Sequence, residues 1–163
     1  MNNNKLTCPQ YISKTAYYSL VWIFQCMYVS VYYKYYLLTS LLTCLTGTSI
    51  CFWGDCNNNV ARHIDIIFAT TTLGVKSYIA IVDFTTVYKY IWFISWTISL
   101  VSYSINGKFD EYITTLHPSP SHLITEQYTD ITRMYYISTY IHMFFIHFLP
   151  TVTFSICLIM TNY

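Results

Sequence analysis

The chain has 163 residues, of which 55% are hydrophobic and only 9% are charged, and its formal net charge is +1. About a quarter of the residues of a soluble domain are charged, so this composition argues against a water-soluble globule. It excludes a charge-rich disordered chain and a basic nucleic-acid-binding domain, because both need a surplus of charge. A polytopic membrane protein that contacts the lipid bilayer and binds no nucleic acid is the class that remains.

Apolar stretches predict an all-α transmembrane helix bundle with about five membrane crossings and a single integral membrane domain. A crossing needs about 20 predominantly apolar residues. The expected spans are residues 16–33, 35–54, 61–82, 85–105 and 134–160. Residues 106–133 are hydrophilic and contain Pro118 and Pro120, which disfavour helix, so we expect an extra-membrane loop there.

Polar residues between the spans predict how they connect. Lys34 lies between two pairs of tyrosines, and Tyr and Lys favour the membrane–water interface, so the first two spans form a hairpin. Residues 55–59 are rich in Asn and form the next turn. Residues 77–88 leave two alternatives: a tight turn that begins at Asp83, or a weakly amphipathic segment that lies flat while Lys76 reaches water. Both alternatives keep the same number of crossings.

The basic residues and the composition bear on orientation and location. Five of the eight basic residues fall on the side of the amino terminus and the long loop, which the positive-inside tendency assigns to the cytoplasm or matrix. A bias toward Tyr, Asn and Ile is typical of AT-rich genomes. We therefore expect an organellar, viral or endomembrane location.

Cysteines and small residues carry structural information. The six cysteines match neither a secreted disulfide framework nor a common zinc motif. Thr43, Gly47 and Cys51 recur every four residues, a spacing that lets another helix approach closely. Packing within the bundle is the favoured interpretation of this stripe, and a dimer interface is the alternative.

Loops and membrane interfaces leave four ionisable residues of the predicted spans unexplained, and such groups are expensive inside a membrane and therefore candidates for function. They are Asp65, Lys76, His142 and His147. The structural alternative for Asp65 is pairing with its basic neighbours, and for Lys76 it is snorkelling to the interface. The two histidines are five residues apart, which separates them by about 140° on a regular helix. A π-bulge near Pro150 would bring their rings together, whereas separate hydrogen bonds to hydroxyl groups are the structural alternative.

The order Ser49, Asp65, His142 and His147 resembles the CREST superfamily, a group of seven-helix membrane proteins that includes alkaline ceramidases and progestin/adiponectin-type receptors. The shared pattern is Ser-xxx-His on one helix, Asp on the next and a late His-xxx-His. The resemblance implies amide hydrolysis at a zinc ion, with Ser49 and Asp65 as catalytic positions and His142 and His147 as metal ligands. This chain has Trp53 where the first histidine is expected, a late spacing of five residues instead of four, and five predicted helices instead of seven.

Three functions follow from these observations, in order of preference. The first is a non-catalytic structural or assembly component of an organellar or viral membrane, with other membrane subunits as partners and no cofactor. The second is a zinc-dependent membrane amide hydrolase of the CREST type or a degenerate relative of one, and zinc is expected only in this case. The third is a small ion or proton transport subunit, suggested by Asp65, Lys76 and the intramembrane histidines.

Overall fold

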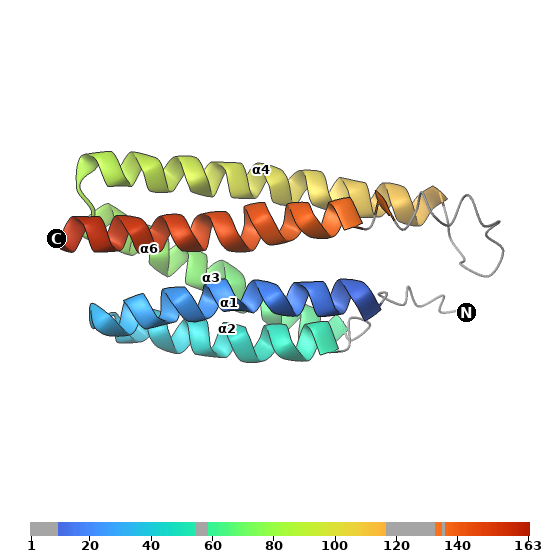
Figure 1. The fold of residues 1–163 in the computed structure, drawn as a ribbon, viewed down its shortest axis with the longest axis horizontal. Coiled ribbons are helices and arrows are strands. Elements are labelled where there is room, and N and C mark those ends of the chain that lie inside the picture. The colour runs from blue at the N-terminus through green and yellow to red at the C-terminus, as the bar shows by residue number, and fades with distance from the viewer. Residues whose placement is uncertain (1–9, 55–58, 117–132, 135) are drawn as a thin grey trace.

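The computed structural model describes residues 10–54, 59–116, 133–134 and 136–163, and these residues form a bundle of five long helices without a β-strand (Figure 1). The last helix contains a π-helical segment, η2, which continues directly into α6. The elements are α1 (Gln10–Tyr32), α2 (Tyr36–Gly54), α3 (Asn59–Asp83), α4 (Thr86–Leu116), η2 (His142–Phe148) and α6 (Leu149–Asn162).

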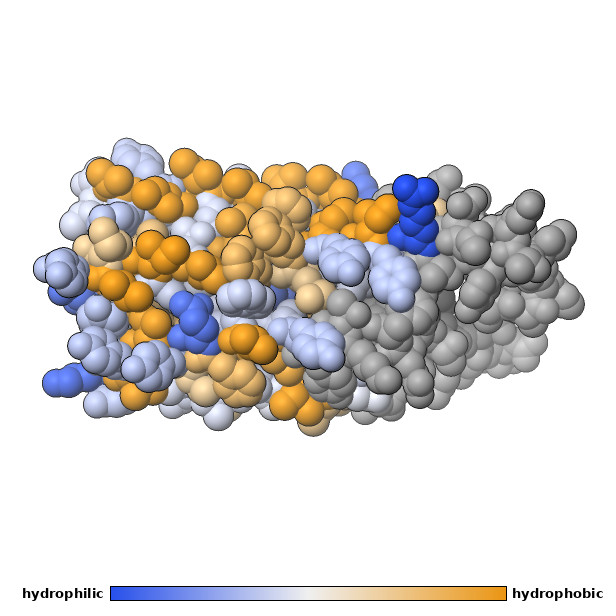
Figure 2. Space-filling view, in the orientation of Figure 1, coloured by the Kyte–Doolittle hydropathy of each residue, from blue (hydrophilic) through white to orange (hydrophobic). Residues whose placement is uncertain are grey.

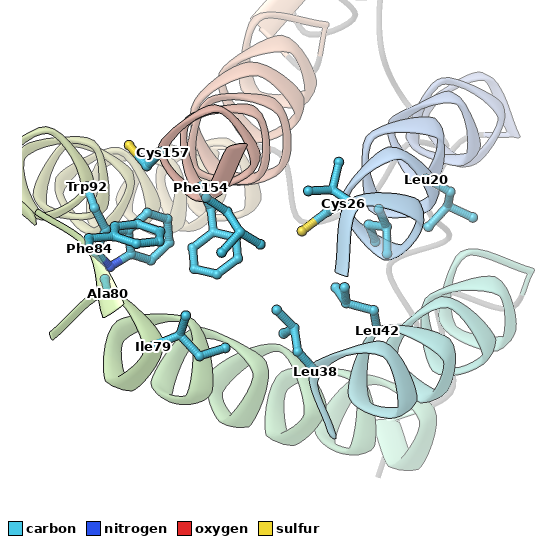
Figure 3. Close-up of a cluster of buried hydrophobic side chains, with 13 residues drawn as sticks. Leu20, Cys26, Leu38, Leu42, Ile79, Ala80, Phe84, Trp92, Phe154 and Cys157 are labelled. Carbon is cyan, nitrogen blue, oxygen red and sulfur yellow. The ribbon is translucent and has the colours of Figure 1, made fainter. Parts of the chain in front are cut away.

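The five helices surround a common interior. α1 packs against α2 and α6, α6 packs against α4, and α3 runs along α2 before it turns into α4. Side chains from all of these helices meet in one buried cluster (Figure 3). Its largest fully buried members include Trp92, Phe154, Leu38 and Leu42. The core is therefore held by residues far apart in the sequence.

Three of the helices are long and apolar enough to cross a membrane: Tyr36–Gly54, Val60–Asp83 and Tyr136–Asn162. α1 contributes a shorter apolar stretch, Tyr18–Tyr32. The all-helical class and these three candidate spans agree with the sequence analysis. The full set of five crossings stays a prediction.

The distribution of polarity supports an integral membrane protein. Large apolar side chains such as Val21, Ile67 and Ile94 are exposed, and apolar residues cover much of the described surface in Figure 2. The interior holds many small hydroxyl side chains, among them Ser30 and Ser155, which each donate to the backbone carbonyl four residues earlier. An apolar exterior over helices whose backbone groups are hydrogen-bonded internally is the arrangement that lipid requires.

α1 ends in a Schellman motif, which forms the turn to α2. Lys34 has a positive φ of 64°, its amide donates to the carbonyl of Val31, and the amide of Tyr35 donates to the carbonyl of Ser30. Lys34 is exposed, as expected for a lysine at the membrane surface. The predicted hairpin between the first two helices is therefore present.

The connection between α3 and α4 resolves the alternatives for residues 77–88. α3 continues to Asp83, only residues 84 and 85 separate it from α4, and Lys76 is buried at 5% exposure. The flat, amphipathic alternative is therefore wrong, and so is the expectation that Lys76 reaches water. The reason is that Lys76 falls on the buried face of α3, four residues from Thr72 and from Ala80.

The predicted loop at residues 106–133 is wrong at its start, because residues 106–116 are helical. α4 continues through its polar end to Leu116. Polar residues alone do not end a helix, and the first strong helix breaker is Pro118, which also disfavours helix at the preceding residue. Residues 117–132, including His117 and His122, lie outside the described residues.

Candidate functional site

Asp65 is held by two hydroxyl groups from the neighbouring helix. Ser49 Oγ donates to its carboxylate at 2.6 Å, and Thr48 Oγ1 lies 3.0 Å from the same oxygen. Ser49 is buried on α2 and Asp65 is half-buried on α3, close to the end of the bundle where α2 ends and α3 begins. Two of the positions that the family resemblance singled out, Ser49 and Asp65, are thus in direct contact.

His142 and His147 face each other because they lie in the π-helix η2. A π-helix closes hydrogen bonds between residues five apart, so side chains at that spacing come to the same side. The amide of Leu149 donates to the carbonyl of Phe144, which is this five-residue pattern. The two Nε2 atoms lie 2.9 Å apart and the ring centroids 4.8 Å apart. One imidazole must therefore donate through Nε2–H and the other must accept, which makes their tautomers different.

Pro150 explains why the helix adopts this form here. Proline has no amide hydrogen, so the carbonyl of Ile146 loses its usual donor four residues later. Pro150 is buried at the start of α6, and Phe148 at the end of η2 packs edge-on against Trp22 of α1 with ring centroids 4.5 Å apart. Local chemistry and packing against α1 both favour the π-helical segment.

The imidazole of His142 lies against Trp53. Their ring centroids are 5.8 Å apart at an angle of 79°. Trp53 lies one turn beyond Ser49 on α2, at the position where the family pattern has a histidine. The structure thus brings residue 53 beside the first of the two late histidines.

Two separate polar groups result from these contacts. Ser49 and Asp65 form one, and His142 and His147 form the other, with no hydrogen bond between the two groups in the described part of the chain. Within residues 10–54, 59–116 and 136–163, no three His, Cys, Asp or Glu side chains are close enough to hold a metal ion. His63, the other histidine of α3, is exposed.

Lys76 is the buried group that sequence reasoning assigned to the surface. Its Nζ atom lies 5.5 Å from the centroid of the Phe154 ring and within electrostatic range of His147. The spacing of Thr72, Lys76, Ile79 and Ala80 on one face of α3 was the signal that could have identified it as buried.

The small-residue stripe on α2 faces outward. Thr43, Gly47 and Cys51 are exposed, and a Cβ atom added to Gly47 would meet nothing within 4 Å. An apolar groove of about 270 Å³ runs beside it, lined by Gly47, Thr48, Cys51, Val60, Ala61 and Ile64. Packing within the bundle accounts for only part of the stripe, since Thr43 Oγ1 lies 3.3 Å from Sδ of Met27 on α1, whereas Gly47 and Cys51 border the groove. Comparison of the chain with protein-family models, curated proteins and solved structures finds no match.

Proposed function

We propose that this chain is a multi-pass integral membrane protein that serves as a non-catalytic component of a membrane assembly, and that its interior is a zinc-hydrolase-like site without its third ligand. The contact between Trp53 and His142 is the observation that carries this proposal. Two contacts support it: Ser49 bonds to Asp65, and His142 bonds to His147. These are the residues that match the CREST pattern.

The residues present do not fit a catalytic zinc ion. Such an ion needs three protein ligands and one open position, and two imidazoles on a tetrahedral zinc have nitrogen atoms about 3.3 Å apart for Zn–N bonds of about 2.0 Å. The histidine pair comes close to this geometry, with nitrogen atoms 2.9 Å apart. The indole of Trp53 has only an N–H donor and cannot bind a metal. A hydrolytic step at zinc is therefore not part of the proposal.

Metal analysis of the purified protein tests this interpretation. We expect the parent protein to carry less than about a tenth of an equivalent of zinc, and Trp53→His to approach one equivalent because it supplies the third imidazole. Trp53→Phe is the matched control and should stay as low as the parent. A parent protein with nearly one zinc, lost in His142→Ala, would instead support the hydrolase. Failure of Trp53→His to gain zinc would remove the link to zinc hydrolases.

The outward stripe on α2 supports an assembly partner. Small residues at this spacing let a transmembrane helix approach the backbone closely, and the neighbouring groove is apolar. We expect partner subunits to co-purify in mild detergent and Gly47→Leu to reduce their recovery several-fold. Gly74→Leu is the control, because a side chain at Gly74 also meets open space but lies on α3 outside the stripe. A clean monomer that binds nothing would contradict an assembly role.

Ion or proton transport is the second candidate function. It is favoured by ionisable groups that are spaced along the long axis of the bundle. Asp65 and Lys76 are separated by about 16 Å along α3, and His147 lies within electrostatic range of Lys76. If the chain conducts ions, liposomes that contain it will show flux and Asp65→Asn will abolish that flux. Absence of flux through the parent protein rules this candidate out.

A further inference from the structure

We propose that the interior around Lys76 binds a small inorganic anion such as chloride. The proposal requires only that the bundle is embedded in a membrane, and it depends on neither the zinc-like site nor an assembly partner. It rests on a buried amine that forms no ion pair with the described residues and on buried hydrogen-bond donors of α3 and α4.

Lys76 is the starting point. It is 5% exposed, and none of the described residues forms an ion pair with it. Its Nζ atom lies 5.5 Å from the centroid of the Phe154 ring, and the imidazole of His147 is within electrostatic range. The two nearest acidic side chains on its own helix are engaged elsewhere, since Asp65 accepts from Ser49 and Asp83 accepts from Tyr35. A buried ammonium group is expensive unless an opposite charge lies beside it.

Unpaired donors lie on the two helices that flank Phe154. On α3, Thr72 Oγ1 has no hydrogen-bond partner among the described residues and precedes Lys76 by one turn. On α4, Trp92 Nε1 and Ser95 Oγ are buried and likewise have no partner in the described part of the chain, and the two residues are three apart and so share a face. Thr72, Trp92 and Ser95 are all less than 5% exposed. Buried polar atoms almost always have partners, so such a group of donors calls for an acceptor.

The α3–α4 turn brings these donors to similar levels in the bundle. Lys76 and Trp92 lie at nearly equal distances along the chain from residues 84 and 85, and both contact the ring of Phe154, Trp92 with ring centroids 5.2 Å apart. Figure 3 shows the indole nitrogen of Trp92 on the edge of the indole that is turned toward Ala80 of α3. The ammonium group of Lys76 and the indole of Trp92 thus share Phe154 as a neighbour, and the hydroxyl groups of Thr72 and Ser95 are buried about one turn further along the same two helices.

This set of groups favours an anion over a cation. An added cation would be repelled by Lys76, and the indole N–H cannot coordinate a metal. Lys76 and the three donor residues are almost completely buried, so only a small ligand can reach them. This favours a halide over a lipid carboxylate.

Thermal unfolding of the purified protein in detergent tests the proposal. We compare sodium chloride with sodium gluconate, whose anion is too large for the site, at equal ionic strength. Chloride at about a hundred times its Kd should raise the midpoint of the parent protein by about 5 °C. Lys76→Met should abolish this difference, Trp92→Phe should weaken it at least several-fold, and Lys108→Met, which removes an exposed lysine of α4, should leave it unchanged.

Three results would overturn the proposal. The first is a parent protein with the same midpoint in chloride and gluconate. The second is a chloride response that persists in Lys76→Met. The third is stabilisation by sodium acetate without stabilisation by chloride, which would identify a carboxylate ligand. If Lys76→Met does not fold, the comparison of the parent with Trp92→Phe decides, since an unchanged response in Trp92→Phe also contradicts the site.

Discussion

The hydroxyl group of Tyr35 donates a hydrogen bond of 2.7 Å to the carboxylate of Asp83, which lies 48 residues away in the sequence. Tyr35 follows the turn between α1 and α2, and Asp83 is the last residue of α3. The bond thus links the α1–α2 connection to the α3–α4 connection at one end of the bundle. No local pattern in the sequence relates these two residues.

Removal of this bond should loosen that end of the bundle. We expect Tyr35→Phe to lower the free energy of unfolding by about 1 kcal/mol, since a bond to a carboxylate is strong but this one is partly exposed to solvent. Tyr36→Phe, at an exposed neighbouring tyrosine, is the control and should change stability little. Chemical unfolding in detergent micelles measures both, and equal stabilities of the two variants would show that the bond contributes nothing.

The same bond predicts a loss of stability at alkaline pH. Burial, followed by the hydrogen bond to Asp83 and its negative charge, raises the pKa of Tyr35 from 10.0 to about 12. Because the pKa is higher in the folded state, the contribution is complete below pH 10 and is lost as the pH rises toward 12. The stability difference between the parent and Tyr35→Phe should therefore shrink over this range. Unfolding midpoints measured between pH 9 and 12 test it, and a constant difference would contradict the coupling.

Lys34 offers a stabilising substitution. It occupies the left-handed position of a Schellman motif with a φ of 64°, where a side chain costs about 1 kcal/mol and glycine is preferred. We expect Lys34→Gly to raise the free energy of unfolding by up to about 1 kcal/mol. Lys108→Gly, at an exposed position within α4, should instead lower it by about 1 kcal/mol. A destabilised Lys34→Gly would mean that the lysine side chain contributes more at the membrane surface than its backbone strain costs.

Much of the helical layout could be predicted because polar residues mark the turns. Lys34 with its tyrosines and the Asn-rich residues 55–59 interrupt apolar stretches, and the described helices end or begin there. The end of α4 could not be predicted in the same way, since helix continues through polar residues 106–116 until a proline follows. Polarity identifies where lipid ends, and it does not identify where a helix ends.

The candidate site could be predicted only in part. Asp65, His142 and His147 stand out because ionisable residues are rare in apolar stretches, but their partners depend on tertiary contacts. The meeting of the two histidines requires a π-helix, which Pro150 permits and packing of Phe148 on Trp22 supports. The burial of Lys76 depends on which face of α3 turns inward, and charge alone suggested the opposite.

The histidine pair should behave as a coupled unit in a double-mutant cycle. Each imidazole gives the other its hydrogen-bond partner at 2.9 Å, so replacement of one leaves a partly buried polar nitrogen without that partner. We expect His142→Phe and His147→Phe each to lower the free energy of unfolding by about 2 kcal/mol, and the double variant to lose about 1 kcal/mol less than the sum. Unfolding of the four proteins in the same detergent measures this coupling. Additive losses would mean that the two rings act independently and that the π-helix does not serve to pair them.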